Sequence, residues 1–108
     1  MTATDRLHGT LDSLVLKALS TQPRHGYGIV CWIRERSDDA VVVEDGSLYP
    51  ALYRMERDSW IEAEWGTSEL GRKAKFYTIT AKGRRQLKAR TAEFVRFVAA
   101  VSPILLSA

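Results

Sequence analysis

Histidine is the side chain best suited to acid–base chemistry near neutral pH, and this sequence has two, His8 and His25. His25 opens the segment His25-Gly26-Tyr27-Gly28. No hydroxyl or carboxylate stands in an arrangement that resembles a catalytic triad with either imidazole. The glycines also lack the third glycine and the preceding strand of a phosphate-binding loop. We therefore expect no catalytic residue and no cofactor, and we expect His25 to help a helix N-terminus meet a phosphate.

Metal, redox and membrane chemistry find equally little support. Cys31 is the only cysteine, which excludes an internal disulfide or a cysteine-based zinc site and fits a reducing cytoplasm. No apolar run approaches the roughly 20 residues of a membrane span. The first residues, Met1 to Arg6, are polar and do not resemble a signal peptide. We expect a cytoplasmic protein of 108 residues without a bound metal.

The distribution of charge is more informative than the net charge of +3. From Arg72 to Arg90 there are eight Lys or Arg residues and no Asp or Glu, whereas the other eight basic residues are mixed with all thirteen acidic ones. A block of one sign is typical of a surface that binds a polyanion. The alternative is a solvated helix face followed by a polar turn.

The N-terminal half is expected to hold two helices and a short strand. Thr10 is a candidate N-cap for a helix that stops at Gln22-Pro23, because the residue before a proline avoids the helical region. A second helix should begin at His25-Gly26 and run to about Ser37, with Ile29, Trp32 and Ile33 buried. After a loop at Ser37 to Asp39, Val41 to Val43 are expected to form a short strand.

A third helix should start near Asp45 to Ser47 and extend to about Asp58. Leu48, Leu52 and Met55 form its inward stripe at i, i+4 and i+7. Pro50 is compatible with this helix if it lies in the first turn, where its missing N–H would have no partner.

Two apolar-alternating runs, 61–65 and 74–79, predict a β-hairpin with a long tip at 66–73. The final helix should begin after Thr80 and end or kink at Pro103. Leu87, Thr91, Phe94, Val98 and Val101 alternate by four and three, which is the spacing of a coiled-coil seam. We therefore predict a mainly α, α+β fold: a winged helix-turn-helix domain over residues 1–80 and a C-terminal dimerisation helix over residues 81–108.

A helix-turn-helix reads DNA by laying its second helix in the major groove. With the leucines and Met55 facing inward, the outward and side positions of the third helix are Ser47, Tyr49, Pro50, Tyr53, Arg54 and Arg57. Their hydroxyl, phenol and guanidinium groups suit phosphates and base edges, and we expect Arg54 to pair bidentately with a guanine. The alternative is a surface helix with both tyrosines half-packed on a neighbour.

The hairpin tip, or wing, carries Arg72, Lys73 and Lys75, which we expect to contact the DNA backbone or a minor groove. The alternative is a solubilising loop. The three tryptophans, Trp32, Trp60 and Trp65, could line a pocket for a flat ligand, although such residues more often pack in the core.

The sequence resembles the PadR family of regulators across residues 7 to about 90. The most specific similarity is Gly46-Ser47-Leu48-Tyr49-Pro50-Ala51-Leu52. It is accompanied by segments at 9–12, 14–16 and 25–27, and by Trp65-Gly66, Ala74-Lys75-Phe76-Tyr77 and Thr80-Ala81-Lys82-Gly83.

The resemblance implies a homodimeric repressor that binds an operator in double-stranded DNA, with the C-terminal helix packed against the partner subunit. It points to Tyr27, Ser47, Tyr49, Pro50 and Tyr53 as DNA-binding residues, with Arg72, Lys73 and Lys75 at the wing. The dimer interface would comprise Leu11, Leu87, Phe94, Val95, Val98 and Val101.

Some family members respond to small aromatic compounds, but this chain is a short form with one C-terminal helix, which gives such an effector no support. The alternative function is a winged helix used only for protein–protein contact.

Overall fold

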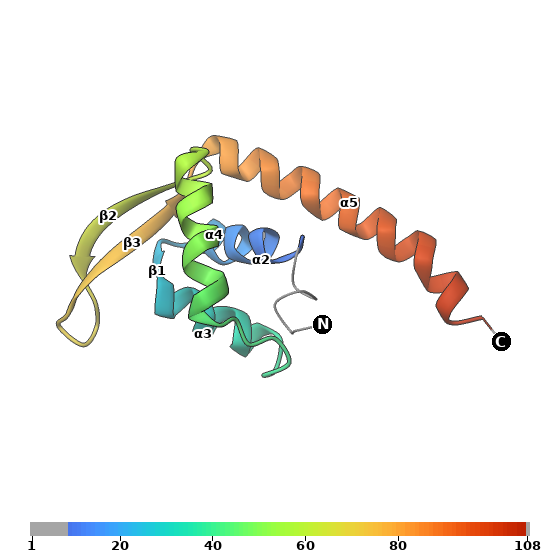
Figure 1. Ribbon diagram of the computed structural model, residues 1–108, viewed down its shortest axis with the longest axis horizontal. Coiled ribbons are helices and arrows are strands. Elements are labelled where there is room, and N and C mark those ends of the chain that lie inside the picture. The colour runs from blue at the N-terminus through green and yellow to red at the C-terminus, as the bar shows by residue number, and fades with distance from the viewer. Residues whose placement is uncertain (1–8, 108) are drawn as a thin grey trace.

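The computed structural model describes residues 9–107 of the chain. Its elements are α2 (Leu11–Thr21), β1 (Arg24–His25), α3 (Gly26–Arg36), α4 (Asp45–Arg57), β2 (Ile61–Thr67), β3 (Lys73–Ile79) and α5 (Ala81–Leu105). Figure 1 shows α4 beside the β2–β3 hairpin. Helix α3 lies near the first turn of α4, and α5 projects away from the body. This α+β arrangement confirms the predicted winged helix-turn-helix fold with an added C-terminal helix.

Side-chain caps define where two of the helices begin. The His25 Nδ1 atom accepts the Gly28 N–H at 3.0 Å, and the Thr80 hydroxyl accepts the Gly83 N–H at 3.0 Å. Each cap satisfies a helix-start N–H that has no partner within the helix. Thr10 occupies the N-cap position of α2, as predicted, but its side chain makes no capping hydrogen bond to that helix.

The first strand is not where the sequence predicts it. Arg24 and His25 pair antiparallel with Tyr77 and Phe76, which places β1 at the edge of a sheet of order β1-β3-β2. The segment 41–43 forms no strand, and β1 and β2 occupy both sides of the central strand β3. Val43 is instead buried from a loop, and its apolar side chain completes the core without pairing its backbone in the sheet.

Helix α4 begins at Asp45, within the predicted range, and buries Leu48, Leu52 and Met55 as predicted. Pro50 lies in the second turn and not in the first, so the prediction of its place is wrong. Its ring nitrogen cannot donate to the carbonyl of Gly46, and the helix continues with one hydrogen bond fewer.

The hairpin is longer and its turn tighter than predicted. Ile61 pairs with Ile79 at the base and Thr67 with Lys73 near the tip. The Ser68 N–H donates to the Arg72 carbonyl at 2.8 Å across the turn, where Gly71 has a φ of +74°. Glycine adopts this left-handed conformation without a steric penalty, which permits the short connection.

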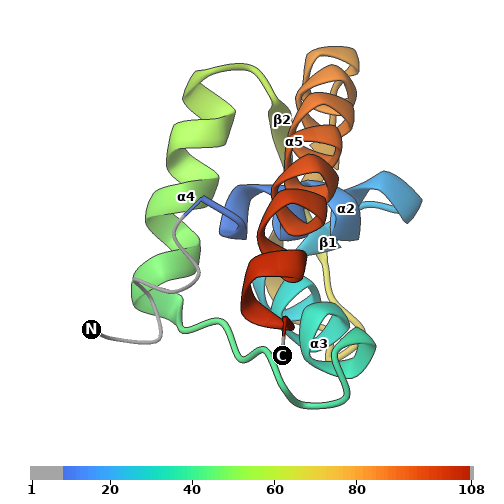
Figure 2. The ribbon, with the colours of Figure 1, turned by 90° about the vertical axis from the view of Figure 1, so that its right-hand side faces the viewer.

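Helix α5 does not end at residue 102, as predicted from Pro103, but continues to Leu105. A proline in the last turn removes one hydrogen bond, while the Leu106 N–H still donates to the Ser102 carbonyl at 2.9 Å. Seen end-on in Figure 2, α5 points away from the body. The radius of gyration is 15.1 Å, compared with about 13 Å for a compact domain of this length, because α5 extends beyond the core.

The tryptophans occupy separate places and do not combine into one pocket. Trp60 is buried at the end of α4, beneath the Arg90 guanidinium. Trp32 is half-buried on α3 between Arg24 and Arg36. Trp65 is exposed on β2. The alternative that the tryptophans pack against the protein therefore applies to Trp60 and Trp32 only.

Candidate nucleic-acid interface

The outward face of α4 follows from the helical period. With Leu48, Leu52 and Met55 buried, the opposite side presents Gly46, Pro50, Tyr53 and Arg57. Tyr53 is the large side chain of this surface, with 72% of its area exposed. A rigid phenol with an apolar ring and one hydroxyl can contact a thymine methyl group and a phosphate or base edge. We call these four residues the outward face of α4.

Tyr49 lies on the flank of α4 that faces α3. Its hydroxyl lies 2.6 Å from where a Cβ on Gly26 would be, so only glycine at position 26 leaves room for the phenol. About half of Tyr49 remains exposed. The alternative in which the tyrosines of this helix are half-packed on a neighbouring element therefore applies to Tyr49. Tyr53 does not make that contact and faces solvent.

Arg54 lies on the other flank, and its guanidinium pairs with Asp12 of α2. The Nη1–Oδ2 and Nη2–Oδ1 distances are 2.6 and 2.9 Å. The hydrogen bond with Asp12 raises the pKa of Arg54 above its ordinary value. The two-pronged geometry that we predicted for a guanine is thus used within the protein. The Arg54 side chain remains 43% exposed, and its contact with a base stays a prediction.

Arg57 is the arginine that the outward face does present. Its side chain is 60% exposed, and its Nε atom lies 3.2 Å from the neighbouring Asp58 carboxylate. The helical pattern predicts Arg57 at a side or outward position, although it is not among the predicted DNA-binding residues. The helical period alone distinguishes the two arginines, because Arg57 follows Tyr53 by four residues and Arg54 does not.

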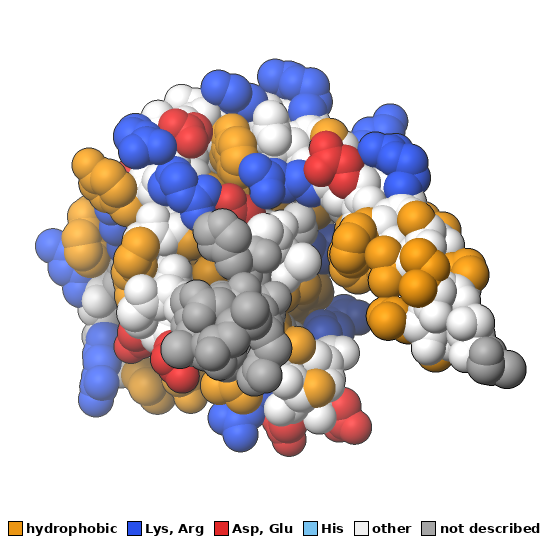
Figure 3. All heavy atoms as spheres, turned by 45° about the vertical axis from the view of Figure 1, so that its right-hand side comes forward, with side chains coloured by type: hydrophobic (Ala, Val, Ile, Leu, Met, Phe, Trp, Pro, Cys, Tyr) orange, Lys and Arg blue, Asp and Glu red, His pale blue; other side chains and the backbone are white. Residues whose placement is uncertain are grey.

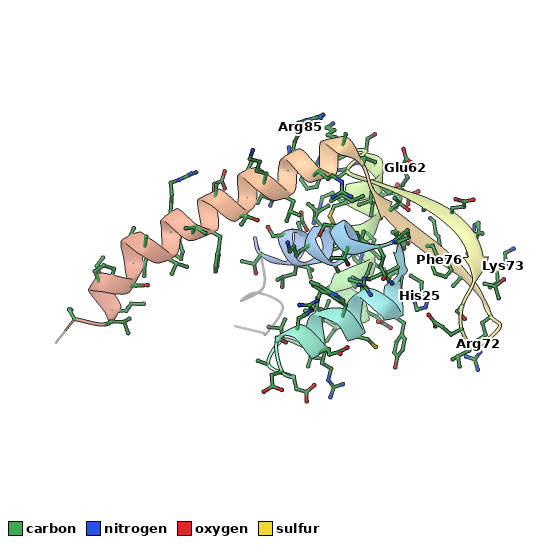
Figure 4. The ribbon with its side chains drawn as sticks, turned by 180° about the vertical axis from the view of Figure 1, so that it is seen from behind. His25, Glu62, Arg72, Lys73, Phe76 and Arg85 are labelled. Carbon is green, nitrogen blue, oxygen red and sulfur yellow. The ribbon has the colours of Figure 1, made fainter. Side chains whose placement is uncertain are left out.

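His25 is part of the framework that joins β1, α3 and the hairpin. Its Nδ1 atom accepts the Gly28 N–H, which leaves the proton of the neutral ring on Nε2. The ring packs edge-on against Phe76 at 5.2 Å between centroids, and Nε2 lies 3.7 Å from a Glu69 carboxylate oxygen. Figure 4 shows His25 and Phe76 side by side behind the hairpin. The structure therefore shows a capping role for His25, and its predicted phosphate contact stays a prediction.

Tyr27 is exposed in the first turn of α3, where its ring stacks near His25. A hydrogen bond with Cys31 raises the pKa of Tyr27 above its ordinary value. At neutral pH a phenol carries its proton even without this shift. A protonated phenol can donate to a phosphate oxygen.

The basic side of the wing faces α4. Successive strand residues point to opposite faces, so Trp65, Lys73 and Lys75 share the face that carries the buried Tyr77 and Ile79. The other face carries Glu62 and Glu64. Figure 4 shows Arg72 and Lys73 at the tip and Glu62 near the base. The alternation separates charge across the hairpin, with the cations on the same side as α4.

The three cations predicted for the wing differ in their exposure and in their contacts. Arg72 and Lys73 are exposed, and the Lys73 ammonium lies 5.2 Å from the centre of the Trp65 ring. The Lys75 ammonium pairs with Glu56 of α4 at 3.3 Å and lies over the Tyr77 ring. Lys75 therefore ties α4 to the sheet, and it does not reach the tip.

The predicted dimer residues fall into two groups. Leu11 is buried in the core, whereas Leu87 is partly buried against it and also lines the groove between α2 and α5. Phe94, Val95 and Val98 are exposed and Val101 is half-buried. Figure 3 shows hydrophobic side chains gathered on the projecting end of α5.

Phe97 is missing from the predicted seam although it is 64% exposed. It flanks Phe94 and Val101 on one side of α5, whereas Val95 flanks Val98 on the other. The predicted series from Leu87 to Val101 passes over Phe97, although Phe94, Phe97, Val101 and Ile104 are themselves spaced by three and four. The apolar face is therefore wider than predicted. Between α2 and α5 lies a groove of about 640 Å³, lined by Leu14, Lys17, Leu87, Phe94, Phe97 and neighbouring residues.

Residues 9–107 contain neither a membrane-spanning helix nor a metal-binding cluster. None of the helices described is long and apolar enough to cross a membrane. Within the same residues, His, Cys, Asp and Glu side chains form no group of three that could hold a metal ion.

Comparison with known proteins places the chain among regulators. The model of the transcriptional regulator PadR-like family matches residues 15–89. A protein of Lysinibacillus sphaericus, described as uncharacterized, is 33% identical over 105 residues, which are 97% of this chain and 93% of that protein. A transcriptional regulator from Clostridium thermocellum has a TM-score of 0.83 at 26% identity, with 91% of this chain and 95% of that chain covered. A PadR-like transcriptional regulator from Bacillus cereus has a TM-score of 0.81 at 30% identity, with 96% and 99% covered.

Proposed function

The chain belongs to the PadR-like family of transcriptional regulators, and we propose that it is a repressor that binds an inverted-repeat operator as a homodimer. The family comprises DNA-binding regulators and not enzymes. A protein of this function works beside the chromosome, and we assign it to the cytoplasm. The domain boundary that we propose lies at residue 80, with DNA binding before it and dimerisation after it.

One observation carries the DNA-binding proposal: the outward face of α4 lies next to the cationic face of the wing. Tyr53 and Arg57 are exposed on α4, and Lys73 is exposed on the neighbouring hairpin face. The acidic residues of β2 point to the opposite side of the sheet. A duplex that places α4 in its major groove would meet cations at the wing and avoid these carboxylates.

We propose that Ser47, Tyr49, Pro50 and Tyr53 line the contact with the groove. The first turns of a recognition helix are the part that reaches base edges. Arg57 lies at the end of α4, where a guanidinium suits a phosphate. Tyr27, Arg72 and Lys73 would complete the backbone contacts on either side. His25, Arg54 and Lys75 make the intramolecular contacts described above, and we keep their contacts with DNA as predictions.

The dimer proposal rests on the uncovered apolar face of α5. Phe94, Phe97 and Val98 are each more than two-fifths exposed on one helix. Exposed apolar surface of this extent usually marks a partner surface. We assign the groove between α2 and α5 to a helix of the second copy and propose no small-molecule effector.

Sequencing of the DNA fragments that the purified protein retains tests this function. We expect an inverted repeat with half-sites about one helical turn apart or a multiple of it. Tyr53→Ala should cost about 1–3 kcal/mol of binding free energy on that operator and little on random DNA. Arg34→Ala, at the exposed end of α3, is the matched control and should leave both affinities unchanged.

The alternative is a winged helix that binds only other proteins. It would be favoured if no sequence is enriched and if folded Tyr49→Ala and Tyr53→Ala variants keep the parent's ratio of operator to random affinity.

A further inference from the structure

We infer that the Asp12–Arg54 ion pair is a positioning device, which fixes the orientation of α4 relative to the dimer and so sets the half-site spacing that the protein accepts. The inference rests on the proposed function, because spacing matters only to a dimer that binds two half-sites. It assigns to Asp12 and Arg54 a role in recognition without contact with DNA.

The pair is built from two helices that are distant in sequence. Asp12 lies in the first turn of α2 and Arg54 in the last turn of α4. Each charge therefore also has the sign that its helix terminus favours. Within residues 9–107, Asp12 is the only charged residue that is buried, with 7% of its area exposed. A buried carboxylate requires a compensating partner, and Arg54 supplies two hydrogen bonds to it.

The geometry of the pair fixes orientation as well as distance. A guanidinium that donates two parallel hydrogen bonds to one carboxylate restricts rotation in a way that an apolar contact does not. On the opposite flank of α4, Glu56 is held by Lys75 of β3. With one ionic tie on each flank, α4 cannot roll about its own axis without breaking one of them. Such a roll would swing Tyr53 away from its outward position.

Helix α2 connects the Asp12–Arg54 ion pair to the proposed subunit contact. Asp12 faces α4, whereas its neighbours Ser13, Leu14 and Lys17 line the groove against α5. A second groove, of about 480 Å³, is lined by Asp12, Arg54 and Arg90 among others, and Arg90 of α5 lines both grooves. A second copy docked on α2 and α5 would therefore be joined to α4 through one short helix.

The consequence appears only when two α4 helices bind the same duplex. Their separation and angle must match the separation and angle of successive major-groove faces. If the pair is broken, each α4 can still meet a half-site, but the two helices no longer hold one relative position. Affinity for the full operator should fall, and the penalty for a wrong spacing should fall with it.

The test uses the full chain and three variants. Asp12→Asn removes the buried charge. Arg54→Lys keeps the positive charge but cannot donate two parallel hydrogen bonds to the carboxylate. Asp39→Asn is the matched control, because Asp39 forms an exposed pair with Arg34 at 3.1 Å, outside the contact between α2 and α4. Binding is measured to the operator, to operators with the spacer lengthened or shortened by single base pairs, and to a duplex with one half-site.

The parent and Asp39→Asn should lose about tenfold in affinity for each change of spacer, as for a mismatched site. Asp12→Asn should bind the native operator about tenfold more weakly and show a flattened spacer profile, with half-site affinity unchanged. Arg54→Lys should lie between them. Equal losses on half-site and full operator would indicate general damage and would overturn the inference, as would an unchanged spacer profile in a folded variant.

A measurement without DNA separates this inference from the proposed function. Amide hydrogen exchange of residues 49–57 should be about tenfold faster in Asp12→Asn than in Asp39→Asn, while residues 61–79 exchange at the parent rate. If the parent shows no spacing preference, the proposed function fails, and the exchange rates alone decide whether the pair positions α4. Unchanged exchange in α4 overturns the inference. If Asp12→Asn does not fold, Arg54→Lys carries the same comparisons.

Discussion

At the scale of single residues, the start of α5 depends on the absence of one side chain. The position of a Cβ on Gly83 is already occupied by the Trp60 carbonyl oxygen, and the Ile79 side chain lies 2.8 Å away. The same carbonyl accepts hydrogen bonds from Thr80. This close approach joins α5 to the end of α4 and therefore sets the angle at which the long helix leaves the body.

Gly83→Ala should lower the free energy of unfolding by about 1–3 kcal/mol, because a backbone carbonyl cannot move aside as a flexible side chain can. Gly46→Ala is the matched control: it lies in α4 with no atom within 4 Å of its Cβ position. That change should be neutral or stabilise the protein by up to about 1 kcal/mol through helix propensity. Urea unfolding of both variants measures the difference, and equal stabilities would contradict this account of Gly83.

Tyr77 predicts a loss of stability at alkaline pH. Its burial raises the pKa of the phenol above its ordinary value, so the folded state keeps the proton more strongly than the unfolded state. The stabilisation is fully present below the unfolded pKa of about 10 and is lost as the pH rises from there through the folded pKa. Tyr77→Phe should reduce that alkaline loss. Tyr53→Phe, on an exposed phenol, is the control and should leave the pH profile of unfolding unchanged.

At the scale of elements, the basic block of the sequence divides into two surfaces. Arg72, Lys73 and Lys75 belong to the hairpin, whereas the remaining five Lys and Arg residues belong to the first half of α5. Figure 4 shows Arg85 on α5 at the opposite end of the hairpin from Arg72 and Lys73. The block therefore does not form one continuous patch, and the two parts should behave differently when DNA binds.

Lys73→Ala should weaken binding similarly for all DNA sequences and reduce the slope of log affinity against log salt by about one to two, given two copies per dimer and roughly 0.9 per phosphate. Lys82→Ala, on α5, carries the same charge change away from the wing and should leave the slope unaltered. Titration of both variants at several salt concentrations checks this. An identical slope for Lys73→Ala and the parent would mean that the wing does not touch the backbone.

At the scale of the whole molecule, α5 gives the protein its elongated shape, with a longest dimension of 55 Å. The body packs around α2, α3 and α4, while residues 91–100 are all exposed. Apolar residues on such a helix are stabilised when a second copy covers them. The dimer is thus expected to contribute to the stability of the chain as well as to its binding of two half-sites.

Phe94→Asp should yield monomers or insoluble protein, because it places a charge in the centre of the apolar face. Lys88→Asp reverses a charge on the basic part of the same helix and is the matched control, which should remain dimeric. Sedimentation at micromolar concentration distinguishes these states. A stable and soluble monomer of the unmutated chain would contradict the dimer proposal.

Much of the fold was determined by signals that act within a few residues. The four-then-three spacing of Leu48, Leu52 and Met55 fixes the buried side of α4, and Thr80 fixes the start of α5 through a cap three residues away. Alternation of apolar residues locates both strands of the hairpin. The segment from Gly46 to Leu52 carries the family resemblance. Local periodicity and capping depend on neighbours along the chain, and the sequence displays those neighbours directly.

Only the tertiary structure decided which polar groups remain available to DNA. Arg54 finds its carboxylate 42 residues away, Lys75 of β3 finds Glu56 on α4, and the edge of β3 is taken by β1 and not by the valines at 41–43. Arg54 and Arg57 are equivalent in type and close in sequence, yet Arg54 is paired with the buried Asp12 of another helix, whereas Arg57 is more exposed and pairs with its neighbour Asp58. Such choices depend on long-range packing, because a charge is free or paired according to what the fold brings beside it.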